Sequence, residues 1–266
     1  SPPMRLRVDV DMTYRLGPSR RAMLAVEAAR YPGQQVAWEA LEIDAARLGR
    51  IGGESGVGTR TWAHVDAAEM RLRYRAEVDV TRADVPLEAR QAAPMHALPA
   101  EAVTYLRPSR FCQSDEFGGF VANRFGDLAG GAKVAAIRDW VAREIAYLQA
   151  SSHQQTTVLD TFARREGVCR DFAHMVCALV RAAGIPARYA SAYGLGVTPE
   201  DFHAVAEVWL DGGWHLVDAT GMCTPDGMAV IGVGRDACDA PFMETEDDAA
   251  LVTQGVSVRR VAGGSG

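Results

Sequence analysis

Cys169 is the cysteine whose surroundings best suit nucleophilic chemistry. It follows Gly167-Val168 and opens a segment with helical periodicity, so we expect it in the first turn of a helix. Unpaired backbone N–H groups and the helix dipole favour an anion there, and the adjoining Arg170 adds positive charge. Because the thiolate is the form of cysteine that attacks carbonyl carbons, this position predicts a nucleophile.

A base for this thiol, and a group to orient the base, are present in a predicted hairpin further along the chain. An attacking cysteine needs both. Residues 203–210 and 214–218 have the alternation of strands, and Asp-Gly-Gly joins them. His203 begins the first strand and Asp218 ends the second. They can interact only if they lie on the same face of the hairpin.

The turn decides where the aspartate lies. A turn at Asp211-Gly212 places Asp218 opposite Val205, and a turn at Gly212-Gly213 places it opposite Glu207. Both put it on the face of the histidine, but only the first makes the two residues diagonal neighbours, about 7 Å apart. A three-residue turn without a bulge would send it to the other face. We predict Asp211-Gly212, or a bulged equivalent.

Each of these three residue types also has an ordinary structural role. A cysteine on an amphipathic helix is usually a packed small side chain, a strand histidine is usually hydrogen-bonded, and an aspartate at a strand end usually forms a turn. The spacing alone therefore does not separate a catalytic triad from these roles.

The other four thiols lack a partner base in the sequence pattern. The five cysteines are an odd number without any C-x-x-C, which argues against a disulfide framework and against a zinc ribbon. Cys177 falls among apolar helix residues, so we expect it in the core. Cys112, Cys223 and Cys238 lie in irregular segments. Free thiols indicate a reducing compartment.

The elements that must position these residues fall into two groups. Residues 5–80 alternate with a period of two and contain glycine-rich turns, which predicts a small β-sandwich. Prolines recur at short intervals between 81 and 120, as in a connecting segment. Helical periodicity then follows, with strands after it. We expect helices over 134–148 (starting at Gly130-Gly131), 157–165 (capped at Gly167) and 169–183, and strands over 187–193, 203–210 and 214–218.

Composition limits the partners. The chain has 266 residues, a net charge of −6 and one lysine, so it offers no basic stripe for nucleic acid. Its apolar runs fall far below the roughly 18 residues of a membrane span, and no signal-like apolar block follows the start. We therefore expect a cytoplasmic protein that binds neither nucleic acid nor membranes. Its oligomeric state is left open.

Four segments, in order, resemble the transglutaminase-like superfamily, in its bacterial cysteine-protease branch. The resemblance spans roughly residues 130–240, and motifs in separate places are more specific than any single one. The segments are REGVCRDFAH at 165–174, GIPARY at 184–189, His203-Ala204 with Glu207-Val208-Trp209, and WHLVDAT at 214–220.

The resemblance implies a fold and a set of roles. The fold class is α+β: an N-terminal antiparallel β-sandwich with a proline-rich linker over 4–110, then a papain- or transglutaminase-like domain over 111–262, with its nucleophile helix packed on an antiparallel sheet. Cys169 is implied as nucleophile, His203 as general base and acid, and Asp218 as the group that orients His203. The sequence departs from the family at Val205, where an aromatic residue is frequent, so the substrate cleft is expected to differ.

These residues predict thiol-dependent acyl transfer on amide or peptide bonds through a thioester. Its partner would be a peptide or protein, and no metal or cofactor is needed. Water as the acceptor makes a peptidase or amidase, which the branch favours; an amine makes a transglutaminase. Two non-hydrolytic hypotheses stay open. One is a silent peptide-binding module; the other is a transition-metal site formed by Cys169, His174, Cys177 and His203, although that spacing matches no common site.

The oxyanion partner is not settled by the sequence. The backbone N–H of Cys169 is a natural donor, and the candidates for a second are Gln113, His153, Gln154 and Gln155. For two further motif residues we favour structural roles, Asp171 at the helix N-terminus and His174 in the core. Residues 194–202, just before His203, form either a substrate-lining loop or an ordinary connection.

Overall fold

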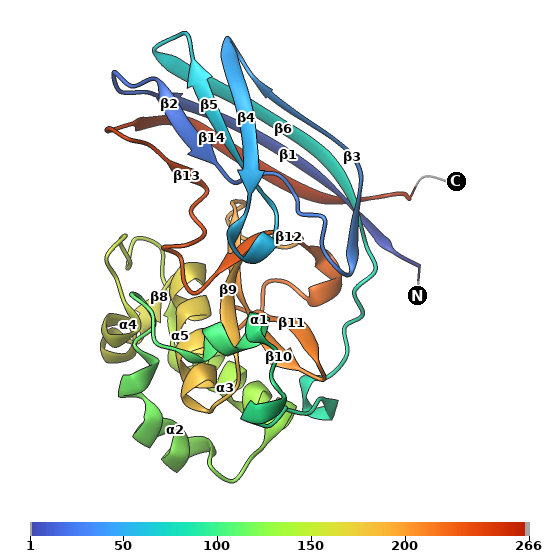
Figure 1. The fold of residues 1–266 in the computed structure, drawn as a ribbon, viewed down its shortest axis with the longest axis vertical. Coiled ribbons are helices and arrows are strands. Elements are labelled where there is room, and N and C mark those ends of the chain that lie inside the picture. The colour runs from blue at the N-terminus through green and yellow to red at the C-terminus, as the bar shows by residue number, and fades with distance from the viewer. Residues whose placement is uncertain (1, 264–266) are drawn as a thin grey trace.

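The first 80 residues, together with two strands near the C-terminus, fold into a sandwich of two antiparallel sheets. A computed structural model describes residues 2–263, and it shows the sandwich at one end and the helices at the other (Figure 1). The strand order is β14-β1-β6-β3 in one sheet and β13-β2-β5-β4 in the other. The strands are β1 (Met4–Arg15), β2 (Arg21–Leu24), β3 (Gln34–Ile43), β4 (Ala46–Gly52), β5 (Thr59–Val65), β6 (Glu69–Val80), β13 (Met243–Glu244) and β14 (Ala250–Val261).

Alternation along β1 and β6 builds the core of this sandwich. Leu6 and Val8 are fully buried, while the charged residues between them lie on the outer face. Opposite charges meet across the outer face, as where the Arg5 guanidinium contacts the Asp79 carboxylate at 2.7 Å. Burial of one face with polar residues on the other is the pattern expected of a half-buried strand.

The part of the chain between β6 and β13 forms a four-stranded antiparallel sheet covered by helices. The sheet has the order β11-β10-β9-β12, and α5 packs on one face of it (Figure 1). The predicted α+β class with an N-terminal sandwich is confirmed. The elements are α1 (Ala100–Val103), α2 (Gly118–Phe125), α3 (Gly130–Glu144), β7 (Ala146–Tyr147), α4 (Val158–Arg164), β8 (Glu166–Gly167), α5 (Cys169–Ala182), β9 (Ala187–Gly194), β10 (His203–Leu210), β11 (Gly213–Val217) and β12 (Met228–Gly234).

Successive residues of β10 point to opposite faces of the sheet, and the two faces pack against different elements. The even-numbered residues Ala206 and Val208 join the core formed with α5, whereas Val205 belongs to a separate apolar cluster with β9 and β12. The N-terminal turn of α5 and the first residues of β10 consequently come to the same end of the domain. The functional residues predicted from the sequence lie at this end.

Two helix ends differ from the prediction. The helix α3 stops at Glu144, so Leu148 falls outside it and is half exposed. It stops because β7 pairs in parallel with β8, a contact between segments 20 residues apart in the sequence. The left-handed residue after α4 is Arg165, with φ +59°, and not Gly167.

Glycine is needed at position 167 for another reason. A Cβ built there would lie 2.7 Å from the Asp171 Cβ, which is closer than real Cβ contacts. The absence of a side chain lets β8 pass directly against the first turn of α5.

The C-terminal segment corrects the predicted domain division. Residues 111–262 were assigned to one domain, but β13 and β14 return to the sandwich, where β14 pairs with β1 over its whole length. The two halves also share a core, since Tyr193 and Ile231 of the second sheet pack into the apolar cluster of the sandwich. Such edge pairing is long-range, and the alternation within one strand does not identify its partner.

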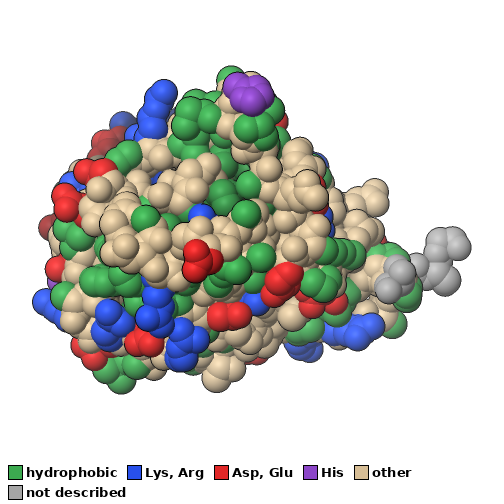
Figure 2. Space-filling view, turned by 90° about the horizontal axis from the view of Figure 1, so that it is seen from below, with side chains coloured by type: hydrophobic (Ala, Val, Ile, Leu, Met, Phe, Trp, Pro, Cys, Tyr) green, Lys and Arg blue, Asp and Glu red, His purple; other side chains and the backbone are tan. Residues whose placement is uncertain are grey.

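Within residues 2–263, no helix has the length and apolar character that crossing a bilayer requires. On the face drawn in Figure 2, Lys and Arg side chains are interspersed with Asp and Glu.

Candidate active site

The hairpin that carries the predicted base has the predicted register. Leu210 pairs with Gly213, so the turn residues are Asp211 and Gly212, with φ of +51° and +72°. Two left-handed residues in a two-residue loop are the geometry that matches the twist of antiparallel strands. Ala206 pairs with Val217, so the same register places the next residue, Asp218, opposite Val205. The predicted turn is confirmed.

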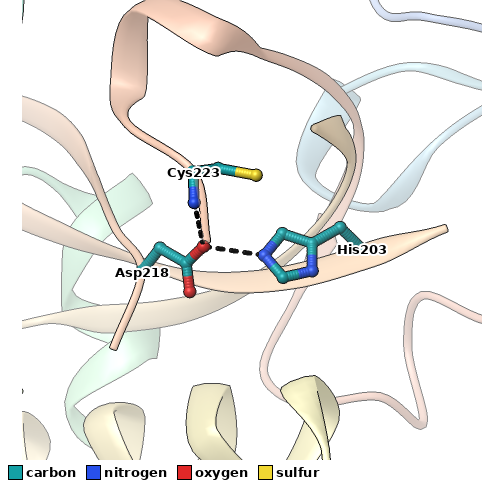
Figure 3. Close-up of side chains that lie close together, drawn as sticks. All are labelled: His203, Asp218 and Cys223. Atoms are coloured by element: carbon teal, nitrogen blue, oxygen red, sulfur yellow. Dashed lines mark hydrogen bonds and ion pairs between the residues drawn. The ribbon is translucent and has the colours of Figure 1, made fainter. Parts of the chain in front are cut away.

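This register joins the imidazole of His203 to the carboxylate of Asp218. His203 Nε2 and Asp218 Oδ2 are 2.7 Å apart, and both side chains are almost fully buried (Figure 3). The carboxylate is fixed by further donors: Oδ1 accepts from the backbone N–H and the hydroxyl of Thr220, and Oδ2 accepts from the backbone N–H of Cys223. Asp218 is thus a positioned acceptor for one nitrogen of the ring.

The other ring nitrogen of His203, Nδ1, is buried, and within residues 2–263 no hydrogen bond to it meets normal geometry. Burial alone would lower the pKa of His203, but the hydrogen bond with Asp218 and the interactions with the Cys169 thiol outweigh it. They raise the pKa of His203 from 6.5 to about 9. The ring therefore lies between a carboxylate on one side and the thiol on the other.

Cys169 is the first residue of α5, as predicted, and its side chain is partly exposed. The start of the helix is fixed by Asp171, whose Oδ2 accepts the backbone N–H of Val168 at 3.0 Å. Cys169 and His203 line the same cavity, which has a volume of about 540 Å³. A partly exposed thiol at a helix N-terminus, facing an imidazole in a cavity, is the environment of a reactive cysteine.

The two motif residues for which we favour structural roles are buried away from this cavity. Asp171 serves as the helix cap just described. His174 accepts the backbone N–H of Ala237 through Nε2 at 3.0 Å and stacks on Phe111. Burial, with the nearby arginines, holds the pKa of His174 well below its usual value. Its position argues against the four-residue metal hypothesis.

The thiol of Cys177, the fourth member of that metal hypothesis, is fully buried in the core, as expected. Burial raises the pKa of Cys177 to about 12.

One of the four candidate oxyanion donors lines the cavity, namely Gln154. The amide of Gln113 donates to the carbonyl of Arg110, and that of Gln155 contacts the ring of His153. Gln154 is held near the thiol because Arg170 donates to its backbone carbonyl at 2.8 Å.

Sequence reasoning missed Cys223, which lies beside the histidine and the aspartate. Its thiol, an imidazole nitrogen and a carboxylate oxygen lie within 4.8 Å of one another, close enough to consider a metal site (Figure 3). Burial first, and the charges of Asp218 and Cys169 next, raise the pKa of Cys223 to about 12. A protonated thiol is a poor ligand, and the 2.7 Å bond between His203 and Asp218 would have to open. The cluster fits a hydrogen-bonded site better than a metal site. No period or motif marked this loop.

Tyr147 was also missed. The parallel pairing of β7 with β8 brings it beside Gly167, and its ring lies 5.6 Å from that of Phe172. Burial first, and the charge of Cys169 next, raise the pKa of Tyr147 to about 12. In the sequence, the predicted helix over 134–148 includes this residue. Nothing in the pattern therefore distinguishes Tyr147 from an ordinary helix residue.

The comparisons with known proteins agree with this fold. A family model for the transglutaminase-like superfamily matches residues 120–219. A crystal structure from Cytophaga hutchinsonii, described as a "putative cysteine protease", is 30% identical, covers 100% of this chain and 93% of that one, and superposes with a TM-score of 0.89.

Curated relatives add sequence similarity over a shorter stretch. An uncharacterised protein of Mycobacterium leprae is 33% identical over 116 residues, and one of Mycobacterium tuberculosis is 32% identical over 127 residues. The matches span 41% and 40% of those relatives and 41% of this chain.

Fold and site together define a class of protein. In this class a β-sandwich precedes a domain in which a cysteine at the start of a helix lies near a histidine on a sheet. The chain belongs to the transglutaminase-like superfamily, in the bacterial branch of its Cytophaga relative.

Proposed function

We propose that the protein is a cysteine peptidase or amidase that cleaves amide bonds through a thioester on Cys169. The observation that carries the proposal is the position of His203. One ring nitrogen is bound to Asp218 at 2.7 Å. The other is buried and makes no hydrogen bond among the residues that the structure describes, and the nearby Cys169 thiol helps to raise the pKa of the ring. Cys169, His203 and Asp218 are the proposed catalytic residues.

The geometry supports a two-step reaction. In the first step His203 Nδ1 takes the thiol proton and the sulfur attacks the amide carbonyl carbon. The C–N bond then breaks, and the histidine returns the proton to the leaving nitrogen. In the second step water attacks the thioester and His203 takes a proton from it. The C–S bond then breaks to release the acid, and His203 returns the proton to the sulfur, which restores the thiol. Asp218 orients the ring and stabilises its protonated form.

The negative charge on the carbonyl oxygen needs donors in the first step. The backbone N–H of Cys169, at the start of α5, supplies one, because the first N–H groups of a helix have no partner within it. Gln154 is the proposed second donor, since it lines the same cavity. All five cysteines are free, so we further propose that the protein works in a reducing compartment such as the cytoplasm.

Trapping of the acyl-enzyme tests this function. The protein would be incubated with a peptide library, quenched in acid and digested, and mass spectrometry would locate any acyl adduct. We expect an adduct on Cys169, which is lost in Cys169→Ser and kept in the matched variant Cys238→Ser, whose thiol is exposed and outside the cavity.

A chase of the trapped species then separates the acceptors. Release of the acid in the presence of excess amine supports hydrolysis, whereas transfer of the acyl group to the amine would make the protein a transglutaminase. Retention of intact peptide without any adduct would indicate a silent binding module and contradict the proposal.

A further inference from the structure

The cavity that holds Cys169 and His203 has walls from both halves of the molecule. Met12 and Tyr14 of β1 contribute from the sandwich, and Asp201 and Phe202 contribute from the segment that leads into β10. A substrate that fills this cavity would contact the sandwich as well as the second sheet.

Besides the proposed catalytic residues, one basic and one acidic side chain line this cavity, Arg170 and Asp201, and their surroundings differ. The guanidinium of Arg170 donates to the backbone carbonyls of His153 and Gln154, and it lies 4.5 Å from the centre of the Phe111 ring. Its N–H groups are thus used mainly in hydrogen bonds within the protein. It therefore holds the loop above the helix and has few donors left for a ligand.

The carboxylate of Asp201 keeps its charge unmatched. Its Oδ1 accepts the backbone N–H of Phe202 at 2.7 Å and the side-chain amide of Gln254 at 3.0 Å, and both donors are neutral. Among residues 2–263, no Lys, Arg or His nitrogen lies within ion-pair distance of it. The residue is exposed, so a cation from solution can reach it.

Apolar side chains flank this carboxylate in a way that suits a long cationic side chain. The ring of Phe202 stacks on that of Phe242 with centroids 4.1 Å apart, and Met12 and Met243 line the same cavity. Lysine and arginine place their methylene stems along apolar surface and keep the charged head near polar groups. The phenol of Tyr14 adds an aromatic face, a favourable neighbour for a cation.

We propose that the thiol centre acts on peptides that carry a lysine or arginine beside the bond attacked, and that Asp201 is the residue that selects this charge. The proposal rests on the proposed function. The alternative role of Asp201 is purely structural, an acceptor that ends the loop before β10. Asparagine keeps an acceptor oxygen for the same two donors and removes only the charge, so Asp201→Asn separates the two roles.

The test compares peptides that are identical except for lysine, norleucine or glutamate at each position flanking the scissile bond. Steady-state kcat/KM would be measured for wild type, Asp201→Asn and the matched control Glu200→Gln, an exposed acid next in sequence that does not line the cavity. We expect wild type and the control to favour lysine over norleucine about tenfold at one position, the ratio for an interaction of about 1.4 kcal/mol. In Asp201→Asn this ratio falls to near one, because kcat/KM for the lysine peptide drops about tenfold relative to that for the norleucine peptide in the same variant.

A reversed charge gives a second reading. Asp201→Lys is expected to favour the glutamate peptide over the lysine peptide. A wild-type enzyme that cleaves all three peptides equally, or a lysine preference that survives in Asp201→Asn, would overturn the proposal.

A binding measurement separates the failure of this proposal from the failure of the proposed function. Fluorescence anisotropy with labelled peptides on Cys169→Ala measures selection without chemistry. Preference for lysine that disappears on adding Asp201→Asn supports the role of Asp201 even if wild type forms no thioester, in which case the proposed function alone fails. Turnover without any preference for the charge of the peptide would support the proposed function and contradict the role of Asp201. Absence of both binding and turnover contradicts both proposals.

Discussion

At the scale of single residues, His203 is the side chain with the most constrained environment. Burial disfavours its charged form, and the Asp218 carboxylate and the Cys169 thiol more than compensate, so its pKa rises to about 9. A buried imidazole with two such neighbours binds a proton more strongly than a free imidazole does. This arrangement suits a group that must accept a proton from sulfur and hold it until an amine leaves.

The raised pKa of His203 predicts a pH dependence of stability. Protonation is more favourable in the folded than in the unfolded protein, so its contribution is complete below pH 6.5 and is lost as the pH rises toward about 9. The size is a few kcal/mol, since one pKa unit is about 1.4 kcal/mol. Urea unfolding should show the free energy of wild type falling across this window, with a smaller slope in His203→Gln. Equal slopes, or a rise with pH, would contradict the assigned environment.

Replacement of Asp218 should affect rate far more than folding. Asp218→Asn keeps the size of the side chain but removes the acceptor charge and allows the wrong ring tautomer. By analogy with serine triads, kcat/KM should drop about 10³- to 10⁴-fold. The exposed Asp115, which is outside the cavity, offers the control Asp115→Asn. A loss of less than about tenfold would remove Asp218 from the mechanism.

At the scale of elements, the β10–β11 hairpin and the start of α5 place the three proposed catalytic side chains, Cys169, His203 and Asp218. The hairpin could be predicted because its parity depends on two local facts, the alternation of 203–210 and a turn with glycine. The ends of α3 and α4 could not, because they depend on a two-residue parallel pairing between β7 and β8. That pairing is long-range and leaves no periodic signal. It is also what brings Tyr147 to the site.

The close approach of β8 to α5 predicts the effect of a single methyl group. In Gly167→Ala the new Cβ would meet the Asp171 Cβ at 2.7 Å and the carboxylate that caps the helix at 3.0 Å. Crowding of this kind typically costs about 1–3 kcal/mol. Denaturant unfolding should show that loss, and alkylation of Cys169 should slow. Gly52→Ala, where a built Cβ meets nothing within 4 Å, should change neither. Wild-type stability in Gly167→Ala would refute the packing described.

At the scale of the whole molecule, the chain leaves the sandwich, forms the second unit and returns to the sandwich with β14. The N- and C-terminal strands lie side by side, as β1 and β14 show in Figure 1. The sandwich could be predicted from its first strands, but its last strand could not. Of the chemistry-bearing residues, Cys169, His203 and Asp218 could be found from motif and spacing. Cys223 and Asp201 are brought to the site by irregular loops, which carry no period.

The return of β14 predicts an asymmetry between two valines of the same strand. Val256 is buried in the sandwich core, whereas Val252 is 45% exposed. A charge buried without a partner costs several kcal/mol, so Val256→Asp should unfold at much lower denaturant or fail to accumulate. Val252→Asp should behave as wild type. Equal effects of the two changes would show that the strand does not pack as described.

The most direct test of the central claim is the rate at which iodoacetamide labels each cysteine at neutral pH, followed by mass spectrometry. The account predicts that Cys169, although less exposed than Cys238, is labelled faster, and that His203→Ala removes this advantage while leaving Cys238 unchanged. Labelling of Cys169 no faster than Cys238, or a rate unaffected by His203→Ala, would contradict the pairing of this thiol with the imidazole.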